Sequence, residues 1–487
     1  MIDDNPNKVL LEDEILEDRL SQLPFDILVN ILNLLTLNEA ARTSVLSHKW
    51  KHLWKYTTIL DFDASGVLMN VTEDTMEEDR NWYIYWVNEV LSSHRALYID
   101  EFRINFDLDV SYESYITNWI YSAISRKVKR FELSFHPAVS WQTLPEIYTF
   151  PQVVYESLKT DIGLAHVKSL RSLIFDSVNI TGEMLEFFIY NCPYLDQLDV
   201  ACSHNLLGLK VVGSELKLKY LDIVFCNNLE ELELSCPSLL SFKYFGPIIK
   251  FTITNVPQLQ DVSIGGGVGG HGLGNGRVLG PIVNYFCQLQ NLELFVELNE
   301  ESIQFPKCEL PALRHLTFQI CARRCSSFLD LICMLKSCPF LQKLTLKMQV
   351  SQYSSEVRSR HQFPKHFHQN LKEVDMIGFS GNPVELELAR YLLENATALE
   401  QLLLEPWVFE SEATIEAARE EARKLEEAIL PPGGEACVSG FLWSPLARVA
   451  SSTVPFGRKL RGLVNRLPDD VLVDIISRLN SWGSCKD

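Results

Sequence analysis

Hydrophobic residues between positions 20 and 54 recur at the spacing of short helices. Pro24 suits the first turn of a helix, because its missing N–H is no loss there. The apolar residues that follow it at helical spacing are Ile27, Leu28, Ile31, Leu32 and Leu35. The pattern therefore predicts a first helix that begins at Pro24 and carries one apolar face.

Two further short helices are expected in the same segment. We expect Asn38 to cap the second helix, which carries Ala41, Val45 and Leu46. Ser47 is the expected cap of a third helix, which places on one face Trp50, Leu53 and Trp54. A unit of roughly 40 residues cannot bury this much Leu, Ile and Trp alone. It must pack against the rest of the chain or against a partner.

A short phrase recurs through the middle of the chain: Leu, two residues, Leu, one residue, and a further hydrophobic residue. Clear copies begin at Leu170, Leu195, Leu218, Leu229, Leu259, Leu289, Leu313 and Leu341. Weaker or later copies begin at Val128, Leu239, Leu371 and Leu399. The alternation at the end of each phrase predicts a short strand with one buried face.

The connections between the phrases differ in length. Some hold a helical stripe, such as Met184, Leu185, Phe188 and Ile189, or Phe328, Leu331, Ile332 and Leu335. The steps from Leu218 to Leu229 and on to Leu239 are too short for a helix. We expect an α/β fold in which parallel strands with helical connections stack into an irregular leucine-rich-repeat solenoid. The alternative is a series of unrelated βα units in one sheet, which would not require the same phrase to recur.

The C-terminal third contains one well-defined helix and an amphipathic one. Asn382 and Pro383 form an N-cap and first-turn pair, and Glu385 can reach back to the cap. The buried stripe expected for this helix is Leu388, Tyr391 and Leu392. We interpret this unit as a C-terminal cap for the solenoid. A charged helix follows over 412–430, and we expect it to pack on the solenoid.

Composition and charge exclude several classes of protein. The chain has 487 residues and a formal net charge of −19, and no Lys/Arg cluster of the kind that nucleic-acid binders carry. We therefore expect no nucleic-acid partner. No apolar run approaches the roughly 20 residues that cross a bilayer, and the N-terminus lacks a signal-peptide pattern. We expect no membrane partner, a cytoplasmic and/or nuclear location, and reduced cysteines.

Candidate chemical sites are weak. Gly265–Gly276 lacks the Lys-Ser/Thr of a phosphate-binding loop, and we interpret it as a connection between repeats. His48 and His52 lack a third metal ligand, and His361, His366 and His368 are expected to form a surface cluster. Cys321, Cys325, Cys333 and Cys338 lack the paired spacing of zinc sites. We predict no catalytic site, no metal and no cofactor, and therefore no enzyme.

The helical segment resembles an F-box, whose pattern is Leu-Pro-x-(Asp/Glu)-hydrophobic followed by Leu-Ser-x-x-Trp-x-x-Leu-Trp. This chain supplies Leu23-Pro24-Phe25-Asp26-Ile27 and Leu46-Ser47 through Trp50 to Leu53-Trp54. The resemblance implies docking on a Skp1-like adaptor and, through it, on a cullin. The residues that it assigns to adaptor binding are Leu23, Pro24, Ile27, Leu28, Ile31, Leu32, Leu46, Ser47, Trp50, Leu53 and Trp54. The alternative is a helical hairpin that packs onto its own domain.

The segment from Gly378 to Gly381 with Glu385 to Ala389 is similar to the FBD module that follows leucine-rich repeats in plant F-box proteins. We interpret the order of segments as F-box (15–60), transition and first irregular repeats (61–165), leucine-rich repeats (166–360), FBD-like module (361–410), amphipathic helix (411–430) and linker (431–463). The last segment, 464–487, reads as a truncated second F-box, because residues 466–479 align with 22–35.

Together these resemblances imply the substrate-recognition subunit of an SCF (Skp1-cullin-F-box) E3 ubiquitin ligase, with an unknown target protein held by the repeats. One alternative is a non-degradative adaptor or scaffold that binds Skp1 and delivers no target. Another is a repeat-based small-molecule co-receptor, which would require a basic pocket that this acidic chain does not favour.

Overall fold

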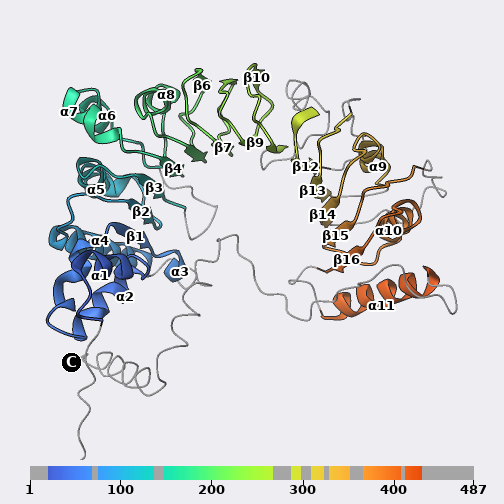
Figure 1. Ribbon diagram of the computed structural model, residues 1–487, viewed down its shortest axis with the longest axis horizontal. Coiled ribbons are helices and arrows are strands. Elements are labelled where there is room, and N and C mark those ends of the chain that lie inside the picture. Colours follow the sequence, from blue (N-terminus) through green and yellow to red (C-terminus); the bar gives the residue numbers. More distant parts are fainter. Residues whose placement is uncertain are drawn as a thin grey trace, which may run out of the picture. The chain divides into compact units, whose positions relative to one another are not determined.

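The computed structural model describes residues 20–68, 75–136, 147–266, 287–297, 309–322, 328–350, 366–406 and 412–429 (Figure 1). The chain divides into two units, Met1–Leu442 and Trp443–Asp487, and all described residues belong to the first. The predicted linker, the second F-box-like segment, most of the glycine-rich connection, His361 and Cys325 lie outside the described residues.

The N-terminal segment folds into short helices, as predicted, but their boundaries differ. They are α1 (Phe25–Leu32), α2 (Leu37–Arg42), and the 3₁₀ turns η1 (Thr43–Val45) and η2 (Trp50–Tyr56). Pro24 is the N-cap of α1 rather than its first helical residue. The predicted cap at Asn38 is wrong: Thr36 caps α2 in a reciprocal capping box with Glu39. A Thr followed three residues later by Glu is the pattern that favours this box, and it starts α2 earlier than expected.

A large sheet of parallel strands, here called the main sheet, runs through the repeats and confirms the predicted fold. Its order is β1-β2-β3-β4-β5-β7-β9-β11-β12-β13-β14-β15-β16. The bounds are β1 (Ile59–Asp63), β2 (Glu101–Asn105), β3 (Arg130–Ser134), β4 (Ser172–Asp176), β5 (Gln197–Ala201), β7 (Tyr220–Val224), β9 (Ser241–Gly246), β11 (Asp261–Gly266), β12 (Asn291–Glu297), β13 (His315–Ala322), β14 (Lys343–Val350), β15 (Glu373–Ile377) and β16 (Gln401–Glu405). Strands β1 and β2 were not predicted; the first position of the phrase is Thr57 before β1 and Ile99 before β2.

A second, smaller sheet replaces the helices where the connections are short. It consists of β6 (Gly208–Val212), β8 (Glu231–Ser235) and β10 (Lys250–Ile253), in the order β10-β8-β6. The phrase at Leu229 therefore forms a strand, as predicted, but in this second sheet. A short step from Leu218 to Leu229 takes the chain half-way round one repeat, so successive phrases alternate between the two sheets.

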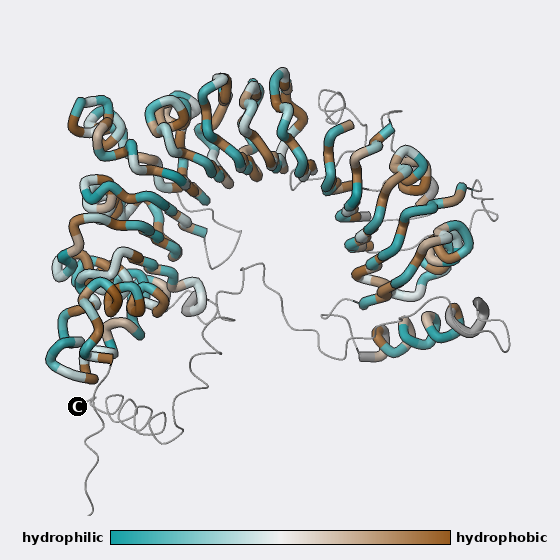
Figure 2. Tube along the Cα trace, in the orientation of Figure 1, coloured by the Kyte–Doolittle hydropathy of each residue, from teal (hydrophilic) through white to brown (hydrophobic). Residues whose placement is uncertain are grey.

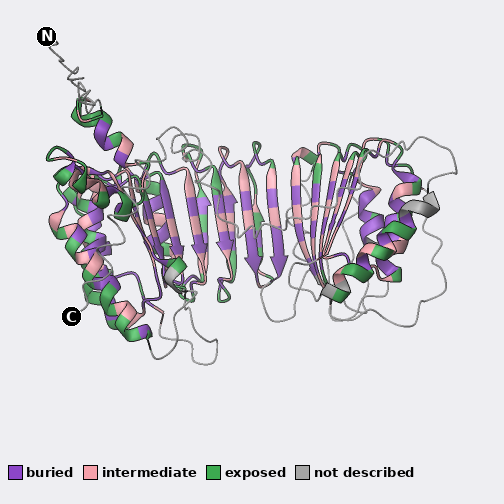
Figure 3. Ribbon diagram, turned by 90° about the horizontal axis from the view of Figure 1, so that it is seen from below, coloured by how far each residue is buried: buried purple, intermediate pink, exposed green. Residues whose placement is uncertain are grey.

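Helices lie on one side of the main sheet. They include α4 (Met76–Ser93), α5 (Glu113–Ser125), α8 (Gly182–Asn191), α9 (Leu329–Leu335) and α10 (Pro383–Asn395), with α6 (Gln152–Leu158) and α7 (Asp161–Val167) in one connection (Figure 1). The predicted stripes of α8 and α9 are buried. Hydrophobic and hydrophilic residues alternate along the strands (Figure 2), and buried residues run through the sheet (Figure 3). The core therefore lies between the sheet and its connections.

The helix of the C-terminal repeat, α10, begins with the cap that the sequence predicts. Asn382 and Glu385 form the capping box of α10, and the buried Glu385 carboxylate also accepts from the backbone N–H groups of Ser380 and Gly381 at 2.8 and 2.9 Å. Helix α11 (Glu412–Ile429) lies against this turn, since a Cβ on Gly381 would be 3.0 Å from Cβ of Glu421. Within the described residues, no helix combines the length and the apolarity that a membrane span requires.

Candidate functional site

The F-box segment has a small core of its own. Four of the residues that we assigned to adaptor binding are buried in it: Leu28, Leu32, Trp50 and Leu53, each 4% exposed or less. They pack with Val29 and Ala40. In this conformation these four side chains offer no surface to a partner. These four residues hold the short helices together. Helical spacing alone did not distinguish them from apolar residues on the outer face.

Polar contacts tie the Leu-Pro turn to the segment that carries the tryptophans. Trp50 Nε1 donates to Ser21 Oγ at 3.0 Å, and Lys49 Nζ donates to the carbonyl oxygens of Leu23, at 2.9 Å, and Ser21. The Ser47 hydroxyl lies 3.2 Å from that of Ser21. Ser47, another predicted adaptor residue, therefore takes part in the internal bracing of the unit.

The outer surface of the same unit carries exposed apolar side chains among polar ones. Among the predicted residues, Ile27 is 45% exposed and Leu46 is 51% exposed; Pro24 is also exposed, and Leu23, Ile31 and Trp54 are half-buried. The prediction missed further exposed side chains, namely Phe25, Leu34 and Val45. Their positions are variable in the F-box pattern, so only their hydrophobic character could have indicated them. Several large apolar side chains exposed on so small a unit favour a protein-binding role for it.

The F-box helices are joined to the start of the first strand by hydrogen bonds that are partly or fully buried. The Asn33 side chain accepts from the Thr58 backbone N–H at 2.9 Å and donates to its hydroxyl at 3.0 Å. His94 Nε2 lies 2.7 Å from the Thr57 carbonyl oxygen. Burial lowers the pKa of His94, and Arg126 acts in the same direction. These contacts fix the F-box to the first repeats.

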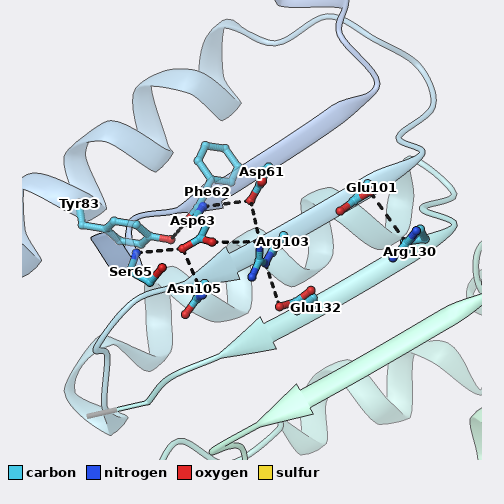
Figure 4. Close-up of polar contacts among 10 residues, drawn as sticks. All are labelled: Asp61, Phe62, Asp63, Ser65, Tyr83, Glu101, Arg103, Asn105, Arg130 and Glu132. Carbon is cyan, nitrogen blue, oxygen red and sulfur yellow. Dashed lines mark hydrogen bonds and ion pairs between the residues drawn. The ribbon is translucent and has the colours of Figure 1, made fainter. Parts of the chain in front are cut away.

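The second candidate surface is the face of the main sheet turned away from the core, here called the open face. It is formed by the residues between the two buried positions of each strand. Near its start, Arg103 contacts three carboxylates: Asp63 at 3.0 Å, Glu132 at 2.9 Å and Asp61 at 3.9 Å (Figure 4). Burial raises the pKa values of Glu132 and Asp61, and Arg103 opposes this shift.

The structure brings together one serine, histidine and aspartate that the sequence did not indicate. Ser177 Oγ lies 2.9 Å from His136 Nδ1, and the Asp176 carboxylate lies 3.7 Å from the same ring nitrogen. A nucleophilic triad requires serine and aspartate at opposite ring nitrogens. This arrangement does not meet that geometry.

The predicted histidines differ in their exposure. His48 and His52 are exposed, as predicted. His368 is not part of a surface cluster: it is 6% exposed, and its Nε2 lies 3.1 Å from Tyr391 Oη. Burial, with His366 and Lys336, lowers the pKa of His368 to about 4. Within the described residues, no group of three or more His, Cys, Asp and Glu side chains has a metal-binding arrangement.

Comparisons with known proteins match both parts of the chain. The F-box domain model matches residues 20–61, and the model described as "At1g61320/AtMIF1, LRR domain" matches residues 90–436. The chain is 25% identical over 431 residues to F-box/FBD/LRR-repeat protein At5g22660 of Arabidopsis thaliana, covering 80% of this chain and 90% of the relative. It is 26% identical over 421 residues to F-box/LRR-repeat protein 13 of the same plant, covering 80% and 89%.

Proposed function

Because this chain belongs to the plant family of F-box proteins with leucine-rich repeats, we propose that it is the substrate-recognition subunit of an SCF-type E3 ubiquitin ligase. Its F-box binds a Skp1-like adaptor and through it a cullin, and its repeats bind a target protein. The observation that carries the proposal is the exposure of Ile27 and Leu46 on a unit whose core is already complete.

The chain contributes no reacting group to this function. It raises the local concentration of a target lysine near the ubiquitin-charged E2 of the ligase, which is an effect of tethering rather than of chemistry. The hydrogen bonds of Asn33 and His94 support this role, because they keep the adaptor-binding surface and the first repeats in a fixed relation. A ligase subunit of this kind acts in the cytoplasm and/or the nucleus.

Reconstitution tests the proposal. The full chain is combined with a plant Skp1-like adaptor, a cullin with its RING subunit, and a charged E2, and ubiquitin transfer to the chain itself is followed. We expect transfer with the parent chain and with Ile162→Asp/Leu207→Asp, which changes two apolar side chains exposed at 72% and 58% on the repeats. We expect loss of transfer with Ile27→Asp/Leu46→Asp. Adaptor binding without cullin recruitment or transfer would instead indicate a non-degradative scaffold.

A further inference from the structure

The F-box carries basic side chains at regular spacing in a chain that is acidic overall. Lys49 is the N-cap of η2, and His52 and Lys55 follow it at steps of three residues. Residues three apart lie above one another in a 3₁₀ turn, so these side chains share one side of η2. The whole chain has a formal net charge of −19. This side of η2 is therefore a local concentration of positive charge on an acidic protein.

The first repeat extends the positive charge. The Arg95 backbone N–H donates to the Lys55 carbonyl oxygen at 2.7 Å, which places the exposed Arg95 beside the end of η2. We call the following residues the basic row: Lys49, Lys51, Lys55 and Arg95. Arg103 has three carboxylate partners, but within the described residues no member of the basic row takes part in an ion pair. The described part of the chain therefore supplies the basic row with no counter-charge.

The polypeptide reaches this surface from its N-terminal side. Lys49 Nζ donates to the carbonyl oxygen of Ser21, which fixes Ser21 at the start of the basic row. The Ser21 hydroxyl lies 3.2 Å from that of Ser47, next to the exposed Leu46. The segment that precedes position 20 is therefore tethered beside both the basic row and the exposed apolar side chains of the F-box.

The sequence of that segment complements the surface in charge and in hydrophobicity. Residues 12–18 lie outside the described residues and read Glu-Asp-Glu-Ile-Leu-Glu-Asp, with five acidic side chains and two apolar ones. The acidic side chains match the basic row. The apolar ones, Ile15 and Leu16, match Val45 and Leu46, which are 78% and 51% exposed. A tether of a few residues gives an effective concentration of about a millimolar, so individually weak contacts are sufficient.

We propose that residues 12–18 dock on the basic row and cover Leu46, so that the chain occupies part of its own adaptor-binding surface. The occupant is this segment rather than an unlinked acidic protein, because exposed ion pairs are weak and the tether compensates for that weakness. An adaptor must then displace the segment, and its apparent affinity falls by the fraction of molecules in which the surface is open. Only the identity of the competitor rests on the proposed function.

Cross-linking of the full chain without adaptor tests the contact itself. A water-soluble carbodiimide joins a carboxylate to a lysine amine where the two touch, and mass spectrometry locates the new amide bond. We expect bonds from residues 12–18 to Lys51 or Lys55, and none to Lys168 or Lys210, which are exposed on the repeats. Ile15→Ser/Leu16→Ser keeps every carboxylate and should lower the yield severalfold. No bond to the basic row, or an unchanged yield in this variant, would overturn the proposal.

Adaptor affinity, measured by isothermal titration calorimetry, tests the competition. Glu14→Gln/Glu17→Gln/Asp18→Asn should bind a plant Skp1-like adaptor about fivefold more tightly than the parent chain, because more molecules present an open surface. Lys55→Gln/Arg95→Gln should show the same gain, and the two sets combined should gain no more than either alone. Lys168→Gln/Lys210→Gln, which removes the same charge from the repeats, should bind like the parent.

The direction of the change in Lys55→Gln/Arg95→Gln is decisive. Weaker adaptor binding in this variant would assign the basic row to the adaptor and overturn the proposal, as would additive gains from the two sets. The cross-linking result also separates the two proposals of this work. A chain that shows the cross-link but binds no adaptor contradicts the proposed function and leaves the docking of residues 12–18 supported.

Discussion

Arg103 in β2 donates its Nε hydrogen to the carboxylate of Glu132 in β3 at 2.9 Å. The same guanidinium lies 3.0 Å from Asp63 in β1, so that one side chain links three consecutive strands. The side chain of Arg103 is 25% exposed, which places this network between a surface ion pair and a buried one.

Replacing Arg103 by methionine should destabilise the first repeats. The substitution keeps the aliphatic stem but leaves Asp61, Asp63 and Glu132 without their shared cation, at an expected cost of about 2 kcal/mol in the free energy of unfolding. Urea denaturation measures the change. Arg130→Met is the control, because the Arg130 side chain is 58% exposed and its contact with Glu101 is long, at 3.9 Å. An equal loss of unfolding free energy in the control would contradict the role of the network.

The stability of the chain should depend on the ionisation of Asp199. Its pKa is about 7 in the folded chain and near the ordinary 3.8 when unfolded, so the folded chain binds the extra proton between these values. Its contribution to stability is complete below the unfolded pKa and is lost as pH rises through about 7. Asp199→Asn should therefore raise the free energy of unfolding by about 1–2 kcal/mol at alkaline pH, after allowance for solvent screening, and flatten its decline with pH. Urea titrations at several pH values test this, and an unchanged pH profile in the variant would refute it.

Glu385 should be essential to the closing repeat. Its carboxylate is fully buried and accepts from the N–H groups of Ser380, Gly381 and Asn382. Glu385→Ala leaves these donors unpaired and should cost about 2 kcal/mol. Amide hydrogen exchange of α10 and α11 reports the loss locally. Glu387→Ala, two residues further along the same helix and half-buried, should leave exchange nearly unchanged, and equal effects in the two variants would rule out the special role of Glu385.

Gly265 should not tolerate a side chain. A Cβ at this position would lie 2.5 Å from Cδ1 of Phe245 and 2.5 Å from Cβ of Phe295. Gly265→Ala should therefore displace the ring of Phe245 and cost about 1–3 kcal/mol. Gly208→Ala serves as the control, since its Cβ would meet the nearest atom, Cγ of Glu231, at an ordinary 3.4 Å. The thermal unfolding midpoints of the two variants provide the comparison, and identical midpoints would contradict the close approach.

Much of the fold follows from local pattern. The alternation that buries Leu198 and Val200 in β5 is present in the sequence, and so is the capping box of α10. The sheet to which a strand belongs is not local information. Leu221 with Ile223 and Leu232 with Leu234 have the same spacing and the same burial, yet β7 joins the main sheet and β8 the second.

Local pattern likewise does not show which residues of the F-box segment are exposed. Leu46 and Trp50 both match the F-box pattern, but Trp50 is 4% exposed and Leu46 is 51% exposed. In a unit of this size the apolar residues serve both the internal core and the outer surface. The sequence spacing of Leu46 and Trp50 does not separate the two roles, because the segment after α2 is built of the 3₁₀ turns η1 and η2. An α-helical periodicity therefore does not tell which of these side chains faces inward.

Adaptor recognition is tested most directly by the affinity of the full chain for a plant Skp1-like adaptor, measured by isothermal titration calorimetry. We predict that the parent chain and Ile162→Asp/Leu207→Asp bind alike, and that Ile27→Asp/Leu46→Asp binds at least about a hundredfold more weakly, with an unchanged circular dichroism spectrum. A parent chain that does not bind the adaptor, or an Ile27→Asp/Leu46→Asp variant that binds as tightly as the parent, would contradict it.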